Sequence, residues 1–378
     1  MKVLIIPDSF KGCMTAQEVA SVMKKAVKIV FPKSSCKMMP FSDGGEGALK
    51  VLETHVEGKI KKCMATDALS RPIQASYFYF TNQKSAWIEL SQTSGLTGLK
   101  KTELNPLITS TWGTGKVILN ALEDGCDKIY LGIGGSATHD FGYGIICALN
   151  GKFFDNNTKT LPLGGGAISK LNRIDLSQMD NRVSKAEWII ACDVENQLLG
   201  NQGAALTYAN QKGASVDMID QLESAGNQFA KVVKSQYGAD IKKIKGGGAA
   251  GGVSAGLYGL FGARLERGFD LLIELTKVDQ EIGEMDLVLT GEGTFDSQSL
   301  FGKLPFKVAQ LTQNQKIPTL IVAGQTTISE LPEMPHVKVY KSKPDYMPHN
   351  EALEKASYNL ELKLIEALHA FKSKNKKL

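Results

Sequence analysis

The segment DLVLTGEGTFDSQSLFGK, residues 286–303, constrains the fold more than any other part of this chain. Its apolar run at 287–289 is bounded by turn residues, which is typical of a strand covered on both faces. Carboxylates, hydroxyls, an amide, glycines and a lysine follow before the segment ends. In open α/β sheets, ligands bind beyond the carboxyl ends of the strands. The segment therefore predicts a buried strand that opens into a binding site, with an ordinary turn of solvated acids as the alternative.

The start of the chain shows the same order of strand, polar loop and helix. An apolar strand is expected at 3–6, and the loop behind it carries Asp8 and Lys11. Thr15 and Glu18 have the spacing of a capping box, which predicts that an amphipathic helix begins there. The loop therefore lies where a sheet presents its ligand-binding groups.

A second strand is expected near 36–40, and the loop SDGGEG at 42–47 follows it. Acids such as Asp43 and Glu46 are favourable at a helix start, which is the structural explanation of this loop. Its glycines are harder to explain, because each weakens a helix start by up to about 1 kcal/mol. We therefore expect a ligand or another backbone to come close to this loop.

The pattern changes in the middle of the chain. Short hairpin-like strands between 61 and 90 indicate that the chain leaves the parallel sheet there. The alternation of strand and helix returns at the strand 128–133. The glycine-rich segment 246–256 predicts either close packing between backbones or an anion-binding loop, and it contains too much glycine for a stable free helix. Further strands are expected at 188–191, 320–323 and 337–340, and helices at 218–237 and 350–371.

Composition excludes several classes of protein. The 378 residues carry a net charge of +5, a small excess that does not indicate a nucleic-acid partner. Six cysteines without a C-x-x-C pair predict reduced thiols and no disulfide framework or zinc site. No secretory signal and no apolar run long enough to span a membrane is present, so we expect a cytoplasmic protein without a membrane partner.

The turn GIGGSATHD at 132–140 formally contains the dinucleotide fingerprint G-x-G-x-x-A. In that motif an acid about twenty residues on should end the next strand. Asp155 instead lies in a polar turn, which argues against a dinucleotide. Phosphate binding by Gly134, Gly135 and Ser136 remains, because backbone N–H groups and a hydroxyl require only the turn.

Phosphoryl transfer is the chemistry that these strand ends fit. The chain has no P-loop and no protein-kinase catalytic loop. Glycine turns, several acids and two or three lysines remain. Phosphoryl transfer requires backbone amides around the phosphates, a cation beside them, a carboxylate for Mg²⁺ and another that orients the attacking hydroxyl.

Six motifs occur in a fixed order: DSFKG, SDGGEG, GIGGSATHDFG, DVEN with QKGA downstream, GGGAAGGVSAG and TGEGTFDSQSLFGK. Together they resemble the glycerate kinase type-1 family over nearly the whole chain. Members of that family transfer phosphate from ATP to D-glycerate, commonly giving 2-phosphoglycerate. The resemblance implies the same activity here, with ATP and Mg²⁺ as cofactors and D-glycerate as the small-molecule substrate.

The resemblance also implies an α/β fold in which a second, inserted α/β domain splits a Rossmann-like parallel sheet domain, with the site in the cleft. We expect the discontinuous Rossmann-like domain at 1–60 and 285–378, and the inserted domain at 61–284. The region 128–150 could instead pack with the first sheet. The sequence does not give the oligomeric state, and a homodimer is one of the alternatives.

The strand-end pattern leads to hypotheses for single residues. Asp193 is expected to orient or deprotonate the attacking hydroxyl, and Lys11 and Lys303 to neutralise a phosphate or the glycerate carboxylate. Asp296 is expected to hold Mg²⁺, with Asp43 or Glu292 as alternatives. Substrate binding is expected at Asp8, Ser9, Asp43, Glu46 and Asn196, and nucleotide binding at Gly134, Gly135, Ser136, Glu292 and Gln298.

Two other functions remain as alternatives. The fingerprint at 132–137 leaves a dinucleotide-dependent oxidoreductase of a small hydroxy acid, and the same polar groups could serve a non-catalytic sugar-acid sensor. The sequence does not decide between the 2- and 3-hydroxyl of glycerate, or which carboxylate is the base and which holds the metal.

Overall fold

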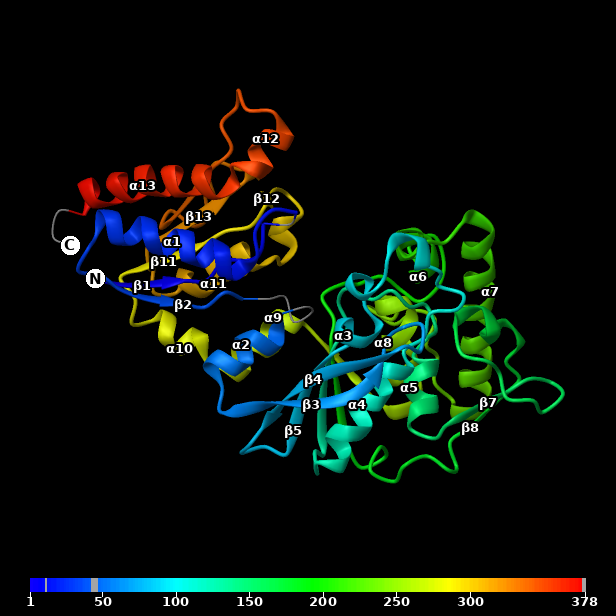
Figure 1. Cartoon of the computed structure of the whole chain (residues 1–378). Helices are drawn as coiled ribbons and strands as arrows, with labels where there is room; N and C mark the ends of the chain where they lie inside the picture. The colour runs from blue at the N-terminus through cyan, green and yellow to red at the C-terminus, as the bar shows by residue number, and fades with distance from the viewer. Residues whose placement is uncertain (11, 42–46, 376–378) are drawn as a thin grey trace. The chain divides into compact units, whose positions relative to one another are not determined.

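The structure is a computed structural model that describes residues 1–10, 12–41 and 47–375. Three predicted site residues, Lys11, Asp43 and Glu46, lie outside the described residues. The chain divides into two compact units. The first unit is Met1–Asp43 with Thr276–Leu378, and the second unit is Gly44–Leu275 (Figure 1). No helix among the described residues is both long and apolar enough to cross a membrane.

The first unit contains a parallel sheet, which confirms the predicted α/β class. Its five strands have the order β15-β13-β11-β1-β2. From β1 the chain builds outward to β2 and then returns to the opposite side of β1 at β11, so the topological switch point lies between β1 and β11. The strands are β1 (Lys2–Ile5), β2 (Ser35–Met38), β11 (Leu287–Thr290), β13 (Thr319–Ala323) and β15 (Val337–Lys341).

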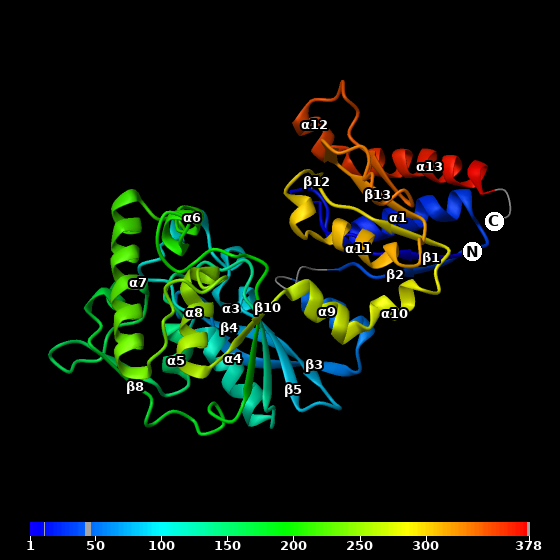
Figure 2. The ribbon, with the colours of Figure 1, turned by 180° about the vertical axis from the view of Figure 1, so that it is seen from behind.

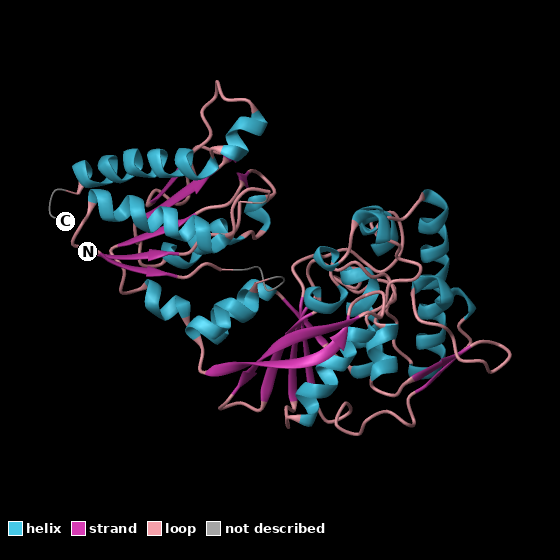
Figure 3. Ribbon diagram, in the orientation of Figure 1, coloured by secondary structure: helices cyan, strands magenta, loops and turns pink. Residues whose placement is uncertain are grey.

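Helices cover both faces of this sheet. On one face α1 (Ala16–Val30) and α13 (Ala356–Lys374) pack against each other over Val3, Ile5 and Leu289 (Figures 1 and 3). On the other face α11 (Leu304–Gln313) packs near Ile321. The expected capping box begins α1: the Thr15 backbone N–H donates to Glu18 Oε2 at 2.7 Å, and the Glu18 N–H donates to Thr15 Oγ1 at 3.3 Å. The unit also contains α10 (Val278–Ile282), α12 (His349–Glu354), η5 (Ser299–Phe301) and a pair formed by β12 (Thr294–Phe295) and β14 (Gln325–Thr326).

The second unit contains a mixed sheet of six strands in the order β10-β9-β6-β5-β4-β3. The pairs β3–β4 and β4–β5 are antiparallel, as the hairpin-like pattern predicts, whereas β5, β6, β9 and β10 run parallel. The region at 128–132 belongs to this sheet as β6, between β5 and β9. The strands are β3 (Gly58–Thr66), β4 (Pro72–Phe80), β5 (Ser85–Glu89), β6 (Lys128–Gly132), β9 (Glu187–Ala191) and β10 (Arg264–Glu266), with β7 (Lys152–Phe154) and β8 (Arg173–Asp175) as a separate pair.

Helices α4 (Trp112–Glu123), α5 (Tyr143–Ala148), α7 (Val216–Tyr237) and α8 (Ala249–Phe261) gather on one side of this sheet (Figures 1 and 2). Helix α2 (Ala48–His55) contacts β3, β4 and β5 from the other side. Shorter elements connect them. These are α3 (Ser91–Ser94), α6 (Ala204–Tyr208), α9 (Gly268–Thr276), η1 (Leu96–Gly98), η2 (Lys101–Glu103), η3 (Gly165–Lys170) and η4 (Asn210–Lys212).

The glycine-rich segment 246–256 enters a helix, and the structure shows why glycine is used. Residues 250–252 are left-handed, and the regular part of α8 follows them. A Cβ on Gly251 would lie 2.4 Å from the Thr138 carbonyl oxygen, and one on Gly256 only 1.9 Å from the Phe141 carbonyl oxygen. Close backbone packing against 138–141 is therefore confirmed. The segment still enters α8 although its composition is unfavourable for a free helix, because tertiary packing outweighs intrinsic propensity.

Candidate active site

The switch point of the first unit brings Asp8, Ser9 and Glu292 to one edge of the sheet. Strands β1 and β11 are parallel neighbours with Ile5 opposite Leu289, so their loops leave side by side. The Asp8 backbone N–H donates to the Gly291 carbonyl at 2.9 Å, which joins the two loops. The Asp8 carboxylate accepts a hydrogen bond from the Ser9 N–H at 2.6 Å. Polar groups that are far apart in sequence therefore meet where α/β sheets bind ligands.

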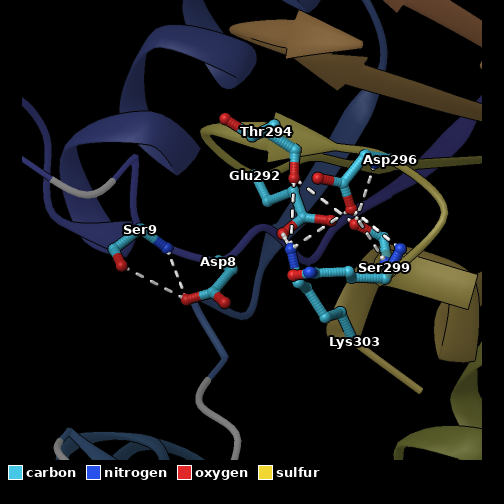
Figure 4. Close-up of polar contacts among 8 residues, drawn as sticks. Asp8, Ser9, Glu292, Thr294, Asp296, Ser299 and Lys303 are labelled. Carbon is cyan, nitrogen blue, oxygen red and sulfur yellow. Dashed lines mark hydrogen bonds and ion pairs between the residues drawn. The ribbon is translucent and has the colours of Figure 1, made fainter. Parts of the chain in front are cut away.

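Lys303 is the centre of this group (Figure 4). Its Nζ lies 3.3 Å from Glu292 Oε2 and 4.0 Å from Asp296 Oδ1, and it donates to the Thr294 carbonyl at 3.4 Å. The Lys303 side chain is 39% exposed and that of Glu292 is 7% exposed. The ammonium is thus held by acidic groups on one side and remains open to an anion on the other.

Glu292 is a buried carboxylate with unused hydrogen-bonding capacity. Burial raises its pKa and the nearby Asp8 charge adds to the rise, whereas the Ser299 hydroxyl and Lys303 oppose the shift. The Oε1 atom of Glu292 has no hydrogen-bond partner among the described residues. Leaving a buried polar atom unpaired costs about 1–3 kcal/mol, so this oxygen is suited to a ligand proton or a cation.

A tight turn orders the residues between Glu292 and Lys303. Asp296 Oδ1 accepts hydrogen bonds from the backbone N–H groups of Gln298 at 2.9 Å and Ser299 at 3.3 Å. The Ser299 hydroxyl accepts from the Asp296 N–H at 3.1 Å and donates to the Thr294 carbonyl at 3.3 Å. The Gln298 side chain is exposed. The turn therefore fixes Asp296 and brings it close to Lys303.

The second unit has its own polar edge, at the carboxyl ends of β5, β6 and β9. Glu89, Gly132 and Ala191 occupy matched positions on these neighbouring strands. The glycine turn that follows Gly132 and the loop that begins with Asp193 therefore leave the same edge. Glu89 is buried there and accepts a hydrogen bond from the Leu49 N–H at 2.8 Å.

The turn at Gly134–Ser136 presents its backbone outward. Gly134 and Gly135 are exposed, and Gly135 has φ 69°. In the described part of the chain, no acceptor is recorded for the N–H groups of residues 134, 135 and 136. The turn is held from behind, because the Leu96 N–H donates to the Gly135 carbonyl at 2.8 Å. Successive N–H groups in such a turn form an anion-binding concavity.

Buried polar side chains lie under this turn. Lys212 donates from Nζ to Ser136 Oγ at 3.1 Å and to the Thr138 carbonyl at 2.6 Å. The fully buried Asp140 accepts hydrogen bonds from the Thr111 N–H at 2.8 Å and the Thr111 hydroxyl at 2.9 Å. Burial raises the pKa of Asp140, and these donors oppose the shift. Because it accepts from Lys212, the Ser136 hydroxyl is hydrogen-bonded inside the protein.

Asp193 and Asn196 lie in the loop after β9. Asp193 is exposed. The Asn196 side-chain amide donates to the Gln202 carbonyl at 2.9 Å, and its oxygen accepts from the Tyr208 hydroxyl at 2.6 Å. Asn196 thus orders the loop that contains α6, whereas Asp193 stands at the solvent-accessible sheet edge.

Sequence reasoning did not single out Glu89, Asp140 or Lys212. Glu89 ends an expected strand, so the strand-end rule that selected Asp193 also applies to it. Asp140 and Lys212 lie within the motif segments GIGGSATHDFG and QKGA, but the strand-end rule does not select either side chain. Acidic and basic side chains are usually exposed, and only the packing shows that these two are buried.

Comparison with known proteins agrees with this architecture. The family model for the glycerate kinase family matches residues 3–371. The chain is 36% identical to a glycerate kinase of Bacillus subtilis, over 96% of this chain and 95% of the relative. It is 38% identical to a glycerate 2-kinase of Escherichia coli, over 86% of each.

The chain belongs to the glycerate kinase family. A crystal structure of a Salmonella typhimurium LT2 protein described as glycerate kinase 2 superposes with a TM-score of 0.84 at 33% identity. The similarity covers 100% of this chain and 99% of the Salmonella chain. The predicted resemblance to glycerate kinases is therefore confirmed, and the Gly134–Ser136 turn and the Lys303 group belong to a glycerate kinase fold.

Proposed function

We propose that this chain transfers the terminal phosphate of ATP to a hydroxyl of glycerate. The grouping of Lys303 with Glu292 and Asp296 at the switch point carries the proposal. Phosphoryl transfer depends on a cation that offsets phosphate charge and on carboxylates placed nearby. The similar E. coli protein is a glycerate 2-kinase, which favours 2-phosphoglycerate as the product.

The turn at Gly134–Ser136 is the proposed binding site for the nucleotide phosphates. The N–H groups of the exposed Gly134 and Gly135 can donate to phosphate oxygens, and these glycines allow close approach of the backbone. In the first unit, the Lys303 ammonium would neutralise a phosphate or the glycerate carboxylate, with Asp8 and Ser9 as hydrogen-bonding groups for the substrate. The Gln298 side chain, exposed on the turn before Lys303, remains a candidate for nucleotide contact.

Mg²⁺ fits the donors of the first unit. Glu292 Oε1 is buried and has no hydrogen-bond partner within the described ranges, and Asp296 lies on the same turn beside Lys303. No group of three His, Cys, Asp or Glu side chains able to hold a metal occurs in residues 1–10, 12–41 and 47–375. Mg²⁺ commonly binds through one or two carboxylates and completes its shell with water and phosphate oxygens, so two carboxylates suffice. When bound, the ion would offset phosphate charge.

Asp193 is the proposed base. Its exposed carboxylate follows β9, where a substrate hydroxyl can reach it without displacing core side chains. An ionised aspartate can orient such a hydroxyl and accept its proton as the phosphate is transferred.

A coupled assay of ADP release with glycerate, tartronate and glycerol tests the proposal. We expect turnover with glycerate, and phosphorus NMR of the product should show a phosphate ester on the 2-hydroxyl. ATP turnover that is independent of glycerate would contradict the assignment. A change in nicotinamide absorbance with a hydroxy acid would support the oxidoreductase alternative, and glycerate binding without ATP turnover would support the sensor.

A further inference from the structure

Lys212 is buried in the second unit, and no carboxylate of the described part of the chain pairs with it. It ends η4 and is 2% exposed. Lysine is almost never fully buried unless it is paired. Among the described residues no ion pair to Lys212 is formed, and its recorded acceptors are Ser136 Oγ and the Thr138 carbonyl. The fold therefore accepts the desolvation cost of the Lys212 amino group, which lies under the turn at 134–138.

The position of Lys212 is set by its neighbours in the chain. Gly213 is left-handed, and a Cβ there would lie 2.3 Å from the Leu104 carbonyl oxygen. The Lys212 N–H donates to the Ala209 carbonyl at 3.0 Å. These contacts direct the Lys212 side chain inward to the turn at 134–138. Within that turn, Ser136 Oγ also accepts a hydrogen bond from the Thr138 N–H at 3.3 Å.

We propose that Lys212 is a positioning residue for phosphate binding, because its amino group fixes the turn from below and takes up a proton when an anion binds above it. The inference rests on the proposed function, since it takes the Gly134–Ser136 turn as the nucleotide site. Lys212 acts on the bound phosphate through its hydrogen bonds to the Ser136 hydroxyl and the Thr138 carbonyl. It supplies a positive charge, which these two neutral groups do not carry.

The surrounding electrostatics support a proton-linked role. Burial lowers the pKa of Lys212 to about 7, and the Asp140 charge opposes the shift. His139, the adjacent titratable group, is fully buried, and both burial and Lys212 lower its pKa, so it stays neutral. A phosphate bound at the turn favours the ammonium form and raises the pKa of Lys212. Binding above neutral pH therefore draws a proton from the buffer.

Titration calorimetry of the full chain with ATP measures this proton. The binding enthalpy is recorded in buffers of different ionisation enthalpy at about pH 8, where a phosphate monoester has already lost its second proton. We expect the wild type to take up a substantial fraction of one proton per ATP. Lys212→Met should lose that uptake and raise KM for ATP about tenfold or more, with a smaller change in kcat. Lys170→Met, which removes an exposed lysine of the same unit, should retain the uptake.

Lys212→Gln, which keeps a donor without a charge, serves as the second variant and covers the case in which Lys212→Met does not fold. Loss of proton uptake in Lys212→Gln supports the inference. If the binding enthalpy depends on the buffer equally in wild type and variant, the inference about Lys212 is overturned, and the proposed kinase function is not affected. A wild type that neither binds ATP nor releases ADP with glycerate overturns the proposed function as well.

Discussion

Lys303 Nζ lies 3.3 Å from Glu292 Oε2, so a partly exposed ammonium is paired with a carboxylate that is almost completely buried. Eleven positions separate the two residues in the chain, and the turn at Asp296 brings them together. A rigid acidic group thus holds a cation that is still accessible to a ligand. In the proposed reaction, such preorganisation would let the charge act on a phosphate without rearrangement.

Replacing Lys303 by Met should lower kcat/KM for phosphorylation by about a hundredfold or more, because a positioned charge on the transferring phosphate is lost. The coupled ADP assay measures the effect. Lys33→Met, which removes an exposed lysine of the same unit, serves as the matched control and should keep normal activity. If Lys303→Met retains the activity of this control, Lys303 does not act on the phosphate.

Glu292→Gln should change how stability depends on pH. Burial raises the pKa of Glu292, so the native state binds more protons than the unfolded state between the ordinary and the raised pKa. Glu292 therefore contributes stability at low pH that is lost as pH rises through its folded pKa. We expect the unfolding free energy of Glu292→Gln relative to wild type to increase across that window.

Urea unfolding at a series of pH values measures this difference. Glu284→Gln, an exposed acid paired with Lys2 at 3.2 Å, is the control and should give a nearly flat difference. A flat difference for Glu292→Gln would show that Ser299 and Lys303 together fully compensate the burial.

Asp193→Asn should reduce kcat by at least about a hundredfold if Asp193 is the base, because the amide cannot accept the proton. Glu195→Gln removes another exposed acid from the same loop and should retain turnover. Near-normal turnover of Asp193→Asn would remove Asp193 from this role, and Glu89 at the end of the neighbouring strand β5 would be the next residue to test.

Gly135→Ala should weaken ATP binding beyond its effect on stability. A left-handed conformation costs a residue with a Cβ about 1–2 kcal/mol, and the new methyl group lies on the exposed turn. Gly125→Ala is the matched control, since Gly125 has φ 85° and open space around a Cβ. Both variants should lose similar thermal stability, whereas KM for ATP should rise only for Gly135→Ala. An equal KM in the two variants would argue against phosphate binding at the turn.

The strand ends were accessible to sequence reasoning because the pattern is local. The run at 287–289 forms β11, the capping box at Thr15 begins α1, and the hairpin-like stretch at 61–90 forms antiparallel strands. Buried strands need continuous apolar runs, and helix starts need specific donors and acceptors, so both leave short-range marks in the sequence.

The burial of Lys212 and Asp140 had no such mark, and neither did the helix in the glycine segment. A charged side chain is buried where distant polar groups accept its hydrogen bonds, as the Ser136 hydroxyl does for Lys212 over a separation of 76 positions. Glycine is required at 251 and 256 only because the backbone at 138–141 packs against these positions. These facts depend on packing between segments that the sequence does not bring together.

By itself, the sequence determined the alternation of strands and helices, the ordered motifs that identify the glycerate kinase family, and the polar residues at each strand end. The tertiary structure decided which of those residues meet: Asp8 with Glu292 at the switch point, and Ser136 with Lys212 under the glycine turn. The physical reason is range. Propensity, capping and periodicity act over a few residues, whereas burial, ion pairing and pKa shifts depend on groups that only the folded chain places next to one another.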